Sequence, residues 1–388
     1  MFNVKLLNKI AVAGMDLFDK EKYNVSENAA APAAILVRSA QMLDYAFNKE
    51  LRCVARAGVG INNIPLERCS REGIVVFYTP GANANAVKEL AIAALLLASR
   101  DIVGGIKWAR ELEGKDADIA KEVESGKNRF EGPELRGKTL GIIGLGAVGA
   151  LIANAAIDLG MKVTGYDPYL TVDAAWQISG KVSRARDINA IYANSDYISI
   201  HVPLTDETRH TINAESLSKT REGVRIINLA RAELIDNAAV GAAMENGRVA
   251  AYVTDFPTND LFQKVPRAIA IPHLGASTPE AEDNCAAMAA ELVMDFLENG
   301  NIKNSANFPD MSLPRSAGNR ICAAYKNIPE ISPAINRVFQ SNNINIAASL
   351  SRSKGEYAYT MLDTDDEAPE DIEDALMKID GVMRVMIL

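Results

Sequence analysis

The sequence contains few of the side chains that build disulfide scaffolds, metal sites or aromatic surfaces. Its 388 residues include four cysteines and three histidines, and aromatic residues make up 6% of the chain. The cysteines at positions 53, 69, 285 and 322 are far apart, and none lies in a Cys-x-x-Cys pair. This spacing excludes a disulfide framework, and we predict no metal site. Isolated thiols of this kind favour the reducing cytoplasm.

The chain also lacks a basic stripe and a targeting segment. Lysine and arginine number 41 against 50 aspartates and glutamates, a net charge of -9 that disfavours a nucleic-acid partner. The apolar run at 10–15 is too short for a signal peptide, because Asp16 ends it. The uncharged run at 140–157 is interrupted by glycines, so we predict a strand, a turn and a helix there and no membrane span.

The order of apolar runs predicts alternating strands and helices. A length of 388 residues suggests two or three domains of about 150 residues each. Runs at 33–37, 54–57 and 74–78 are typical of covered parallel strands, and the apolar helix at 90–99 is typical of a buried connector. A second series of expected strands comprises Leu140–Ile143, Lys162–Tyr166, Tyr197–His201, Arg225–Leu229, Ala250–Thr254 and Ala268–Ile271. This pattern predicts an α/β fold with a doubly wound parallel sheet, followed by a long helix that ends at Gly300 and returns to the first unit.

A third, small domain is expected at the C-terminus. The composition changes to Pro, Ser, Gly and Asn between Leu313 and Asn319, which indicates a linker. Strands are then expected at 320–325, 344–350, 357–362 and 382–388, with helices after the first and the third of them. The order βαββαβ predicts a ferredoxin-like domain over residues 318–388.

A glycine-rich turn in the second series predicts a dinucleotide site. Gly144, Gly146 and Gly149 follow an expected strand and open an expected helix, so a pyrophosphate can approach the backbone amides there. The next strand ends at Asp167, whose carboxylate can accept hydrogen bonds from both ribose hydroxyls. Because this carboxylate would repel a 2'-phosphate, we predict NAD and not NADP.

The histidines are the main candidates for acid–base chemistry. His273 stands at the carboxyl end of an expected strand, where ligands bind in an open α/β sheet. His201 also ends a strand, and it either bonds nearby backbone or lines the nicotinamide. His210 lies in a polar segment and is expected on the surface. Arg231 follows another strand, where its guanidinium could clamp a substrate carboxylate or instead pair with Glu233.

These motifs together resemble the D-2-hydroxyacid dehydrogenases and, within that family, the phosphoglycerate dehydrogenase branch. The resemblance covers nearly the whole chain and implies that His273 is the catalytic histidine and Arg231 the substrate arginine. It further implies substrate contacts by Arg38, Ser39, Gly60 and Asn83. The implied cofactor contacts are Gly144, Gly146, Ala147, Val148, Gly149, Asp167, His201, Pro203, Thr208, Ala230, Asp255 and Gly275.

One segment departs from the family pattern. The family pairs its histidine with a glutamate in a segment like Asp-Val-Phe-x-x-Glu-Pro, which this chain lacks. Alignment on Phe256 puts Asn259 at the glutamate, whereas alignment on Asp255 puts Asp260 there. A carboxylate at Asp260 would raise the basicity of His273, and an amide at Asn259 would only orient the ring. The sequence leaves both alternatives open.

The C-terminal domain resembles an ACT domain, a small ligand-sensing module. The resemblance implies that Asn327 and Asn345 bind an amino-acid effector such as serine. Tyr325 stands where a histidine is common, and Glu330 replaces a glycine that leaves room for the ligand. The alternative is a domain that serves only assembly into a homo-oligomer, either a dimer or a tetramer.

The resemblance implies NAD-dependent oxidation of 3-phospho-D-glycerate to 3-phosphohydroxypyruvate, in the first step of serine biosynthesis. The expected domains are a discontinuous, flavodoxin-like substrate domain at 1–98 and 285–312, an NAD domain at 99–284, and the ACT-like tail. Candidate cations for the substrate phosphate are Arg38, Arg56, Lys127 and Arg129. Two alternatives are a glyoxylate or hydroxypyruvate reductase and a non-catalytic NAD-sensing protein.

Overall fold

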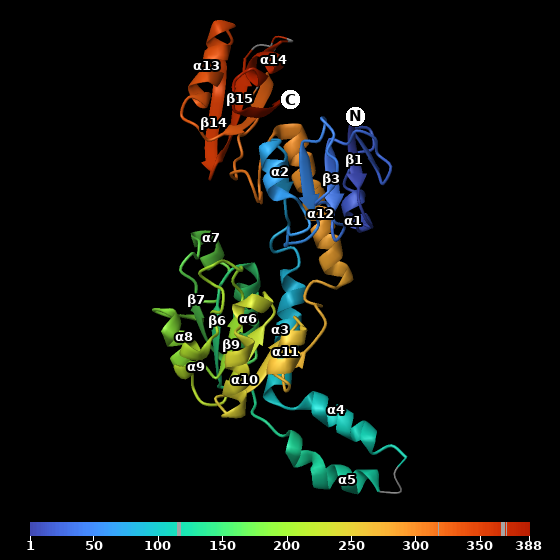
Figure 1. Ribbon diagram of the computed structural model, residues 1–388, viewed down its shortest axis with the longest axis vertical. Coiled ribbons are helices and arrows are strands. Elements are labelled where there is room, and N and C mark those ends of the chain that lie inside the picture. Colours follow the sequence, from blue (N-terminus) through green and yellow to red (C-terminus); the bar gives the residue numbers. More distant parts are fainter. Residues whose placement is uncertain (115–117, 317, 366–368, 370) are drawn as a thin grey trace. The chain divides into compact units, whose positions relative to one another are not determined.

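The computed structural model describes residues 1–114, 118–316, 318–365, 369 and 371–388. Two compact units make up the described chain (Figure 1). The first comprises Met1–Asn83 and Pro279–Leu388, and the second comprises Ala84–Thr278. The units divide after Asn83 and after Thr278, whereas the sequence suggested divisions at 98/99 and 284/285. Helix α3 (Ala84–Ser99) accounts for the first difference, because its apolar face packs on helix α6 and the sheet of the second unit.

The first unit opens with a five-stranded parallel sheet of order β2-β1-β3-β4-β5. Strands β3 and β4 lie at its centre and are almost entirely buried, as their apolar residues predict. The long helix α12 returns from the second unit and packs on β3, β4 and α1, which confirms the expected crossover. The elements are β1 (Phe2–Leu6), α1 (Val12–Met15), β2 (Tyr23–Ser26), β3 (Ala34–Val37), β4 (Cys53–Arg56), α2 (Leu66–Arg71), β5 (Val75–Phe77) and α12 (Pro279–Asn299).

The second unit contains the doubly wound sheet that the sequence predicts. Its seven parallel strands have the order β12-β11-β10-β9-β6-β7-β8, so the strand order reverses between β6 and β9. The strands are β6 (Thr139–Ile143), β7 (Lys162–Tyr166), β8 (Ser183–Arg184), β9 (Tyr197–Ile200), β10 (Val224–Asn228), β11 (Val249–Thr254) and β12 (Ile269–Ala270). The helices are α3, α4 (Ile102–Glu111), α5 (Ile119–Gly126), η1 (Lys127–Phe130), α6 (Ala147–Asp158), α7 (Val172–Ala175), α8 (Ile188–Asn194), α9 (Ala214–Ser218), η2 (Ala232–Leu234), α10 (Asn237–Glu245) and α11 (Asn259–Lys264).

The C-terminal tail has the expected βαββαβ order and an antiparallel sheet of order β14-β15-β13-β16. Its elements are β13 (Asn319–Lys326), α13 (Ile331–Ser341), β14 (Ile346–Lys354), β15 (Tyr357–Thr364), α14 (Ile372–Met377) and β16 (Val382–Ile387). One face of the sheet, which includes Ile321 and Leu362, packs under α13 and α14. The other face, which includes Cys322 and Tyr359, joins the core of the first unit beside Phe296.

The tail is therefore attached to the first unit by more than a linker. Arg320 and Asp363 form a buried ion pair of 2.6 Å, with side chains 0% and 2% exposed. The Arg320 guanidinium also donates to the carbonyls of Leu313 and Pro314 in the expected linker. On the edge strand β16 of the tail sheet, Arg384 donates to the carbonyls of Lys49 and Glu72. The linker composition at 313–319 gave no sign of this packing.

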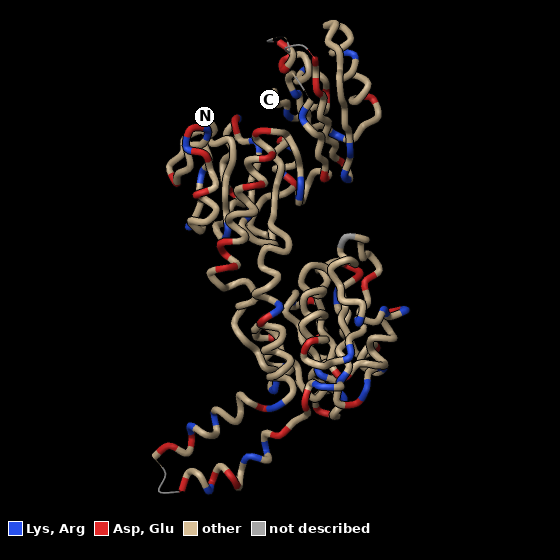
Figure 2. The backbone as a smooth tube through the Cα atoms, turned by 180° about the vertical axis from the view of Figure 1, so that it is seen from behind, with Lys and Arg blue, Asp and Glu red and all other residues tan. Residues whose placement is uncertain are grey.

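Both charge signs are interspersed along the backbone of each unit (Figure 2). No helix in the described residues is long and apolar enough to cross a membrane. The four cysteines are buried and unpaired in this part of the chain, as the sequence predicts.

Candidate functional site

The glycine turn between β6 and α6 has the geometry of a phosphate-binding loop. Gly144 has a φ of 93°, and a Cβ there would lie 2.6 Å from the carbonyl oxygen of His201. Gly149 is equally closed to a side chain, because its Cβ would meet the carbonyl of Gly144. Gly146, which precedes the first turn of α6 at Ala147 and Val148, has open space where a Cβ would stand. The turn thus leaves free backbone at the N-terminus of α6, where a pyrophosphate fits.

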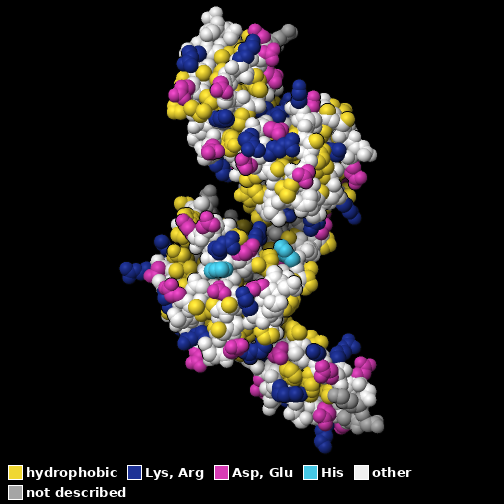
Figure 3. Space-filling view, in the orientation of Figure 1, with side chains coloured by type: hydrophobic (Ala, Val, Ile, Leu, Met, Phe, Trp, Pro, Cys, Tyr) yellow, Lys and Arg dark blue, Asp and Glu magenta, His cyan; other side chains and the backbone are white. Residues whose placement is uncertain are grey.

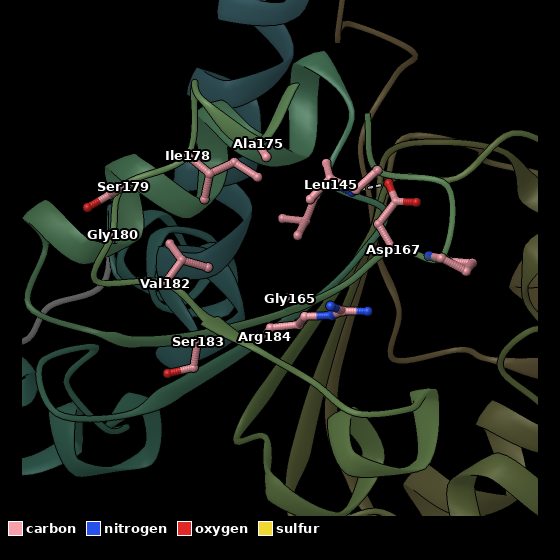
Figure 4. A pocket seen from close by; sticks show the side chains of 12 residues that line it. Leu145, Gly165, Asp167, Ala175, Ile178, Ser179, Gly180, Val182, Ser183 and Arg184 are labelled. Atoms are coloured by element: carbon pink, nitrogen blue, oxygen red, sulfur yellow. Dashed lines mark hydrogen bonds between the residues drawn. The ribbon is translucent and has the colours of Figure 1, made fainter. Parts of the chain in front are cut away.

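Asp167 follows β7 and lies beside this turn (Figure 4). Its two carboxylate oxygens accept hydrogen bonds of 2.9 Å from the backbone amides of Leu145 and Tyr169. The carboxylate lines a cavity of about 370 Å³ together with Leu145, Gly165, Pro168, Leu170, Ala175, Ile178, Ser179, Gly180, Val182, Ser183 and Arg184. A carboxylate held next to a free glycine turn is suited to receive the ribose end of NAD.

His201 at the end of β9 is a neutral residue in this structure. Its Nε2 lies 2.7 Å from the hydroxyl of Ser199, so the ring bonds a side chain and not the backbone. Burial lowers the pKa of His201 to about 4. A neutral imidazole at physiological pH can line a cofactor but supplies no proton. In the following loop, the Thr208 hydroxyl donates to the carbonyl of Pro203 at 2.6 Å, whereas His210 is exposed at the surface.

Arg231 is presented by a turn that the buried side chain of Asn228 organises. The Asn228 amide donates to the carbonyl of Arg231 at 2.8 Å, and its oxygen accepts from the amide of Ala230 at 3.1 Å. The Arg231 side chain is exposed, and one of its nitrogens donates to the Ala230 carbonyl. Within the described residues it forms no ion pair with Glu233. The guanidinium therefore keeps donors for a ligand at the carboxyl edge of the sheet.

His273 follows β12 at the same edge, and its ring is exposed. The ring centroid lies 4.9 Å from that of Phe256, with an angle of 57° between the planes. The charge of His273 acts on Asp255, which directly follows β11 and is 1% exposed. Burial raises the pKa of Asp255, and the charges of His273 and Arg231 oppose that rise. These three side chains therefore share one electrostatic environment.

Asp255 is also incompletely satisfied. The backbone amide of Gly275 bonds its carboxyl group, yet its Oδ1 is buried without any hydrogen-bond partner among the described residues. A Cβ at Gly275 would lie 3.4 Å from the Asp255 Oδ2, which is close packing. An unpartnered buried oxygen is costly in a folded chain, so this atom is a candidate for contact with a ligand.

The structure does not bring Asp260 or Asn259 to His273. Both residues stand in the first turn of α11 and are exposed. Asp260 pairs with Lys264 at 2.7 Å and accepts a hydrogen bond of 2.9 Å from Asn237. These contacts lower its pKa. The sequence treated Asp255 only as a cofactor contact, although its position directly after a buried strand is the signal that places it beside His273.

The expected substrate contacts of the first unit follow the carboxyl ends of β3, β4 and β5. Arg38 pairs with Glu282 at 2.6 Å, and its carbonyl accepts a hydrogen bond of 3.0 Å from the Arg56 side chain. Two of the four candidate phosphate-binding cations are therefore neighbours. Ser39 is exposed, and Gly60 and Asn83 are half-buried in loops of this unit.

The other two candidate cations belong to the hairpin of α4, α5 and η1. Lys127 pairs with Glu124 at 2.5 Å, and the Arg129 guanidinium lies 4.7 Å from the ring centroid of Trp108. Both side chains are thus engaged within the hairpin. Such local contacts would compete with a substrate phosphate for the same donors.

The two asparagines of the tail also have protein partners. The Asn327 amide donates to the Gly355 carbonyl at 3.0 Å, and the Asn345 amide bonds the carboxylate of Asp365. Tyr325 is buried under α13 and α14, and Glu330 immediately precedes α13. In the described residues, no three His, Cys, Asp or Glu side chains are grouped to hold a metal ion.

Comparison with known proteins identifies relatives of this arrangement. Residues 92–275 match the family model "D-isomer specific 2-hydroxyacid dehydrogenase, NAD binding domain". The D-3-phosphoglycerate dehydrogenase of Bacillus subtilis is 35% identical over 330 residues, covering 80% of this chain and 60% of that protein. The protein of the same name from Archaeoglobus fulgidus is 36% identical over 288 residues, covering 72% and 52%. The chain thus spans little more than half the length of these curated relatives.

Solved structures share the fold. The NAD+-bound 3-phosphoglycerate dehydrogenase of Entamoeba histolytica is 27% identical, with a TM-score of 0.60 over 79% of this chain and 98% of that chain. The D-mandelate dehydrogenase of Rhodotorula graminis is 22% identical, with a TM-score of 0.67 over 80% and 99%. The second likeness shows the fold alone. Together these structures confirm the α/β fold class that the sequence predicts.

Proposed function

We propose that the chain, whose residues 92–275 match the NAD-binding domain of the D-isomer specific 2-hydroxyacid dehydrogenases, is a member of that family and oxidises 3-phospho-D-glycerate to 3-phosphohydroxypyruvate. The observation that supports this proposal best is the group of Arg231, His273 and Asp255 at the carboxyl edge of the cofactor sheet. Arg231 holds the substrate carboxylate, and His273 takes the proton of the C2 hydroxyl. Gly146 and Asp167 would hold NAD, which would supply the acceptor for the hydride of C2.

Asp255 takes the part that the family gives to its glutamate. The carboxylate is buried beside His273 and is bonded by the amide of Gly275. A negative charge in this place stabilises the imidazolium that forms when His273 accepts a proton. In the proposed reaction Asp260 has no such part, because Lys264 and Asn237 hold it.

The same group of residues fits NAD as the cofactor. The open position at Gly146 and the N-terminus of α6 would receive the pyrophosphate, and Asp167 would hold the ribose hydroxyls. His201, Pro203, Thr208 and Ala230 lie in loops at the carboxyl ends of neighbouring strands and would complete the cradle. The neutral state of His201 suits contact with an uncharged part of the cofactor.

A steady-state assay separates this proposal from its alternatives. We expect the protein to consume NADH with phosphohydroxypyruvate far more efficiently than with hydroxypyruvate or glyoxylate. Of the four candidate cations we propose Arg56 as a contact of the substrate phosphate, so Arg56→Ala should raise KM for the phosphorylated substrate and leave the values for the other two nearly unchanged. Equal kcat/KM for all three substrates would favour a general reductase. No turnover with any of them, together with tight NADH binding, would favour a sensor.

The hairpin of α4 and α5 supports assembly into a homo-oligomer. Neither helix buries a residue, and apolar side chains including Ile102, Val103, Ile106 and Ile119 are exposed on it. Figure 3 shows apolar side chains between charged ones on this part of the surface. We infer that a second copy covers the hairpin, since exposed apolar surface of this kind usually marks an interface. Light scattering of Ile106→Glu should report a smaller particle than the unmodified protein.

The buried free cysteines fit the cytoplasm, where we place the protein.

A further inference from the structure

A second cavity lies at the amino-terminal edge of the cofactor sheet, away from the glycine turn. It has a volume of about 550 Å³ and opens beside Thr139 and Lys162, the first residues of β6 and β7. The other lining residues are Ile157, Gly160, Met161, Val163, Thr164, Lys181, Ser183, Asn194 and Arg221. The cavity shares only Ser183 with the cavity beside Asp167, and nothing in the proposed reaction uses it.

The charged residues that line this cavity are all cationic. Lys162, Lys181 and Arg221 line it, and no carboxylate does, although the chain as a whole carries a net charge of -9. Arg221 pairs with Asp196 at 3.1 Å just outside the lining. Lys162 and Lys181 form no ion pair with any described residue. Their ammonium groups therefore keep their donors for an anion.

Two hydroxyl groups stand next to these cations. Lys162 and Thr164 alternate along β7 and point to the same face of the sheet. Thr164 is the direct neighbour of Ser183 across the β7–β8 pair, so their side chains share that face. Lys181 precedes Ser183 by two residues and lines the same cavity. Ammonium and hydroxyl donors on one wall are the groups that bind phosphate oxygens.

A structural explanation accounts for only part of this arrangement. Helices α6 and α8 end at this edge of the sheet, and the negative ends of helices favour nearby cations. That effect requires neither a cavity nor hydroxyl groups. Lys162 is the exposed first residue of β7 and Thr164 is partly exposed, so both side chains can reach the cavity.

We propose that this cavity is a binding site for a small phosphate monoester. Lys162 and Lys181 hold the phosphate group, and Thr164 and Ser183 donate to its remaining oxygens. The lining also includes the partly buried Ile157 of α6, beside which the carbon skeleton of the ligand would lie. The volume suits a metabolite-sized ligand. The site is independent of the proposed function, because it contains none of the catalytic residues.

Calorimetric titration of the full chain with Arg56→Ala, saturated with NADH, tests the proposal, since NADH then occupies the glycine turn and the cation proposed for the substrate phosphate is absent. The probes are glycerol 3-phosphate, inorganic phosphate and glycerol. We expect glycerol 3-phosphate to bind more tightly than phosphate, and glycerol to give no signal. Lys162→Ala with Lys181→Ala should weaken binding at least about tenfold, because two charge-assisted contacts are lost. Lys162→Arg with Lys181→Arg should retain binding.

The matched control is Lys20→Ala with Lys303→Ala, which removes the same charge from exposed positions of the first unit. It should bind glycerol 3-phosphate like the unmodified protein. Unchanged NADH affinity and circular dichroism would show that the site variant is folded. Independently of any variant, the backbone amides of Thr164 and Ser183 should shift in NMR spectra during the titration. The proposal is overturned if the site variant binds as tightly as the unmodified protein, if the control loses binding equally, or if these amides do not move.

Discussion

The carboxyl edge of the cofactor sheet and the buried face of the tail sheet use polar side chains in opposite ways. At the carboxyl edge, Arg231 keeps free donors and Asp255 has a buried oxygen without a partner. In the tail, Arg320 and Asp363 are as deeply buried as Asp255, but each is bonded to the other and to nearby groups. At the carboxyl edge, polar atoms without hydrogen-bond partners indicate a site where a ligand completes the contacts. In the tail, the polar side-chain atoms of Arg320 and Asp363 all have partners, which indicates a place where two parts of the chain are joined.

The largest expected effect is on turnover at the carboxyl edge. His273→Ala should lower kcat by roughly 10²- to 10⁴-fold, because a positioned proton acceptor contributes about that much. NADH binding should change little, since His273 is assigned to the substrate. Stopped-flow turnover and NADH fluorescence titration measure the two quantities. Near-normal kcat in this variant would remove His273 from the mechanism.

The next effect is on stability in the tail. Asp363→Ala leaves the Arg320 guanidinium buried without its partner, which should cost about 3–5 kcal/mol of unfolding free energy. The double change Arg320→Met with Asp363→Leu is the matched control and should cost much less, because no charge is left buried. Urea unfolding measures both variants. Equal losses in the two would show that packing, and not charge, joins the tail to the first unit.

The same pair predicts a pH dependence. Burial alone would raise the pKa of Asp363, but hydrogen bonds from Arg320 and Ser316 outweigh it and the pKa lies below its ordinary value. A lowered pKa in the folded state stabilises the protein above the pKa of an unfolded aspartate, about 3.9. This contribution is therefore full at neutral pH and is lost as the pH falls below about 4 toward the folded pKa. Asp363→Ala should show a weaker loss of stability over that acidic range.

A change beside the glycine turn should alter the preference for NAD over NADP. Asp167→Ala removes the carboxylate that repels a 2'-phosphate, and Arg184 in the same cavity is available to attract one. The preference for NAD over NADP, measured as a ratio of kcat/KM values, should fall by at least about tenfold. Equal efficiency of both cofactors in the unmodified protein would contradict the assignment of Asp167.

A smaller effect, on the pH dependence of the reaction, distinguishes Asp255 from Asp260 as the partner of His273. Asp255→Asn removes the buried counter-charge of the imidazolium, so ketoacid reduction should decline at a lower pH than in the unmodified protein. Asp260→Asn should leave the pH profile unchanged, because Asp260 is held by Lys264. The pH dependence of kcat/KM for both variants decides the matter. The reverse result would return the role to Asp260.

The smallest expected effect is that of serine on the unmodified protein. Asn327 and Asn345 already have partners, Tyr325 is buried, and Glu330 adds a negative charge near the expected site. We therefore expect weak or no inhibition, and more in a protein with Glu330→Gly and Tyr325→His. Serine titration at fixed substrate compares the two proteins. Strong inhibition of the unmodified protein at low serine would show that Glu330 does not obstruct the ligand.

Local features of the sequence predicted most of the fold. The strand at Lys162–Tyr166 agrees with the structure at both ends, and the other expected strands agree within a few residues. Such runs are recognisable because apolar composition and glycine turns are local signals. Packing between distant segments was not recognisable in this way. The placement of α3 against α6 and the attachment of the tail beside Phe296 both depend on contacts far apart in the chain.

The residues of the candidate site also fall into two groups, those that local sequence signals predict and those that they do not. Gly146, Asp167, Arg231 and His273 each follow or open a regular element, so their positions could be predicted from the sequence. The partner of His273 could not, because alignment on Phe256 indicates Asn259, alignment on Asp255 indicates Asp260, and the two alignments are equally good. Asn259 and Asp260 lie on the exposed first turn of α11, whereas Asp255 is buried directly after β11, and this burial is the basis for proposing Asp255.

Transfer of an isotopic label tests the central claim most directly. Phosphohydroxypyruvate is incubated with the protein and NADH deuterated at both C4 positions, and the product is examined by mass spectrometry and chiral chromatography. The account predicts 3-phospho-D-glycerate with one deuterium at C2, formed by the unmodified protein and nearly absent with His273→Ala. An unlabelled product, the L-isomer, or equal labelling by both proteins would contradict it.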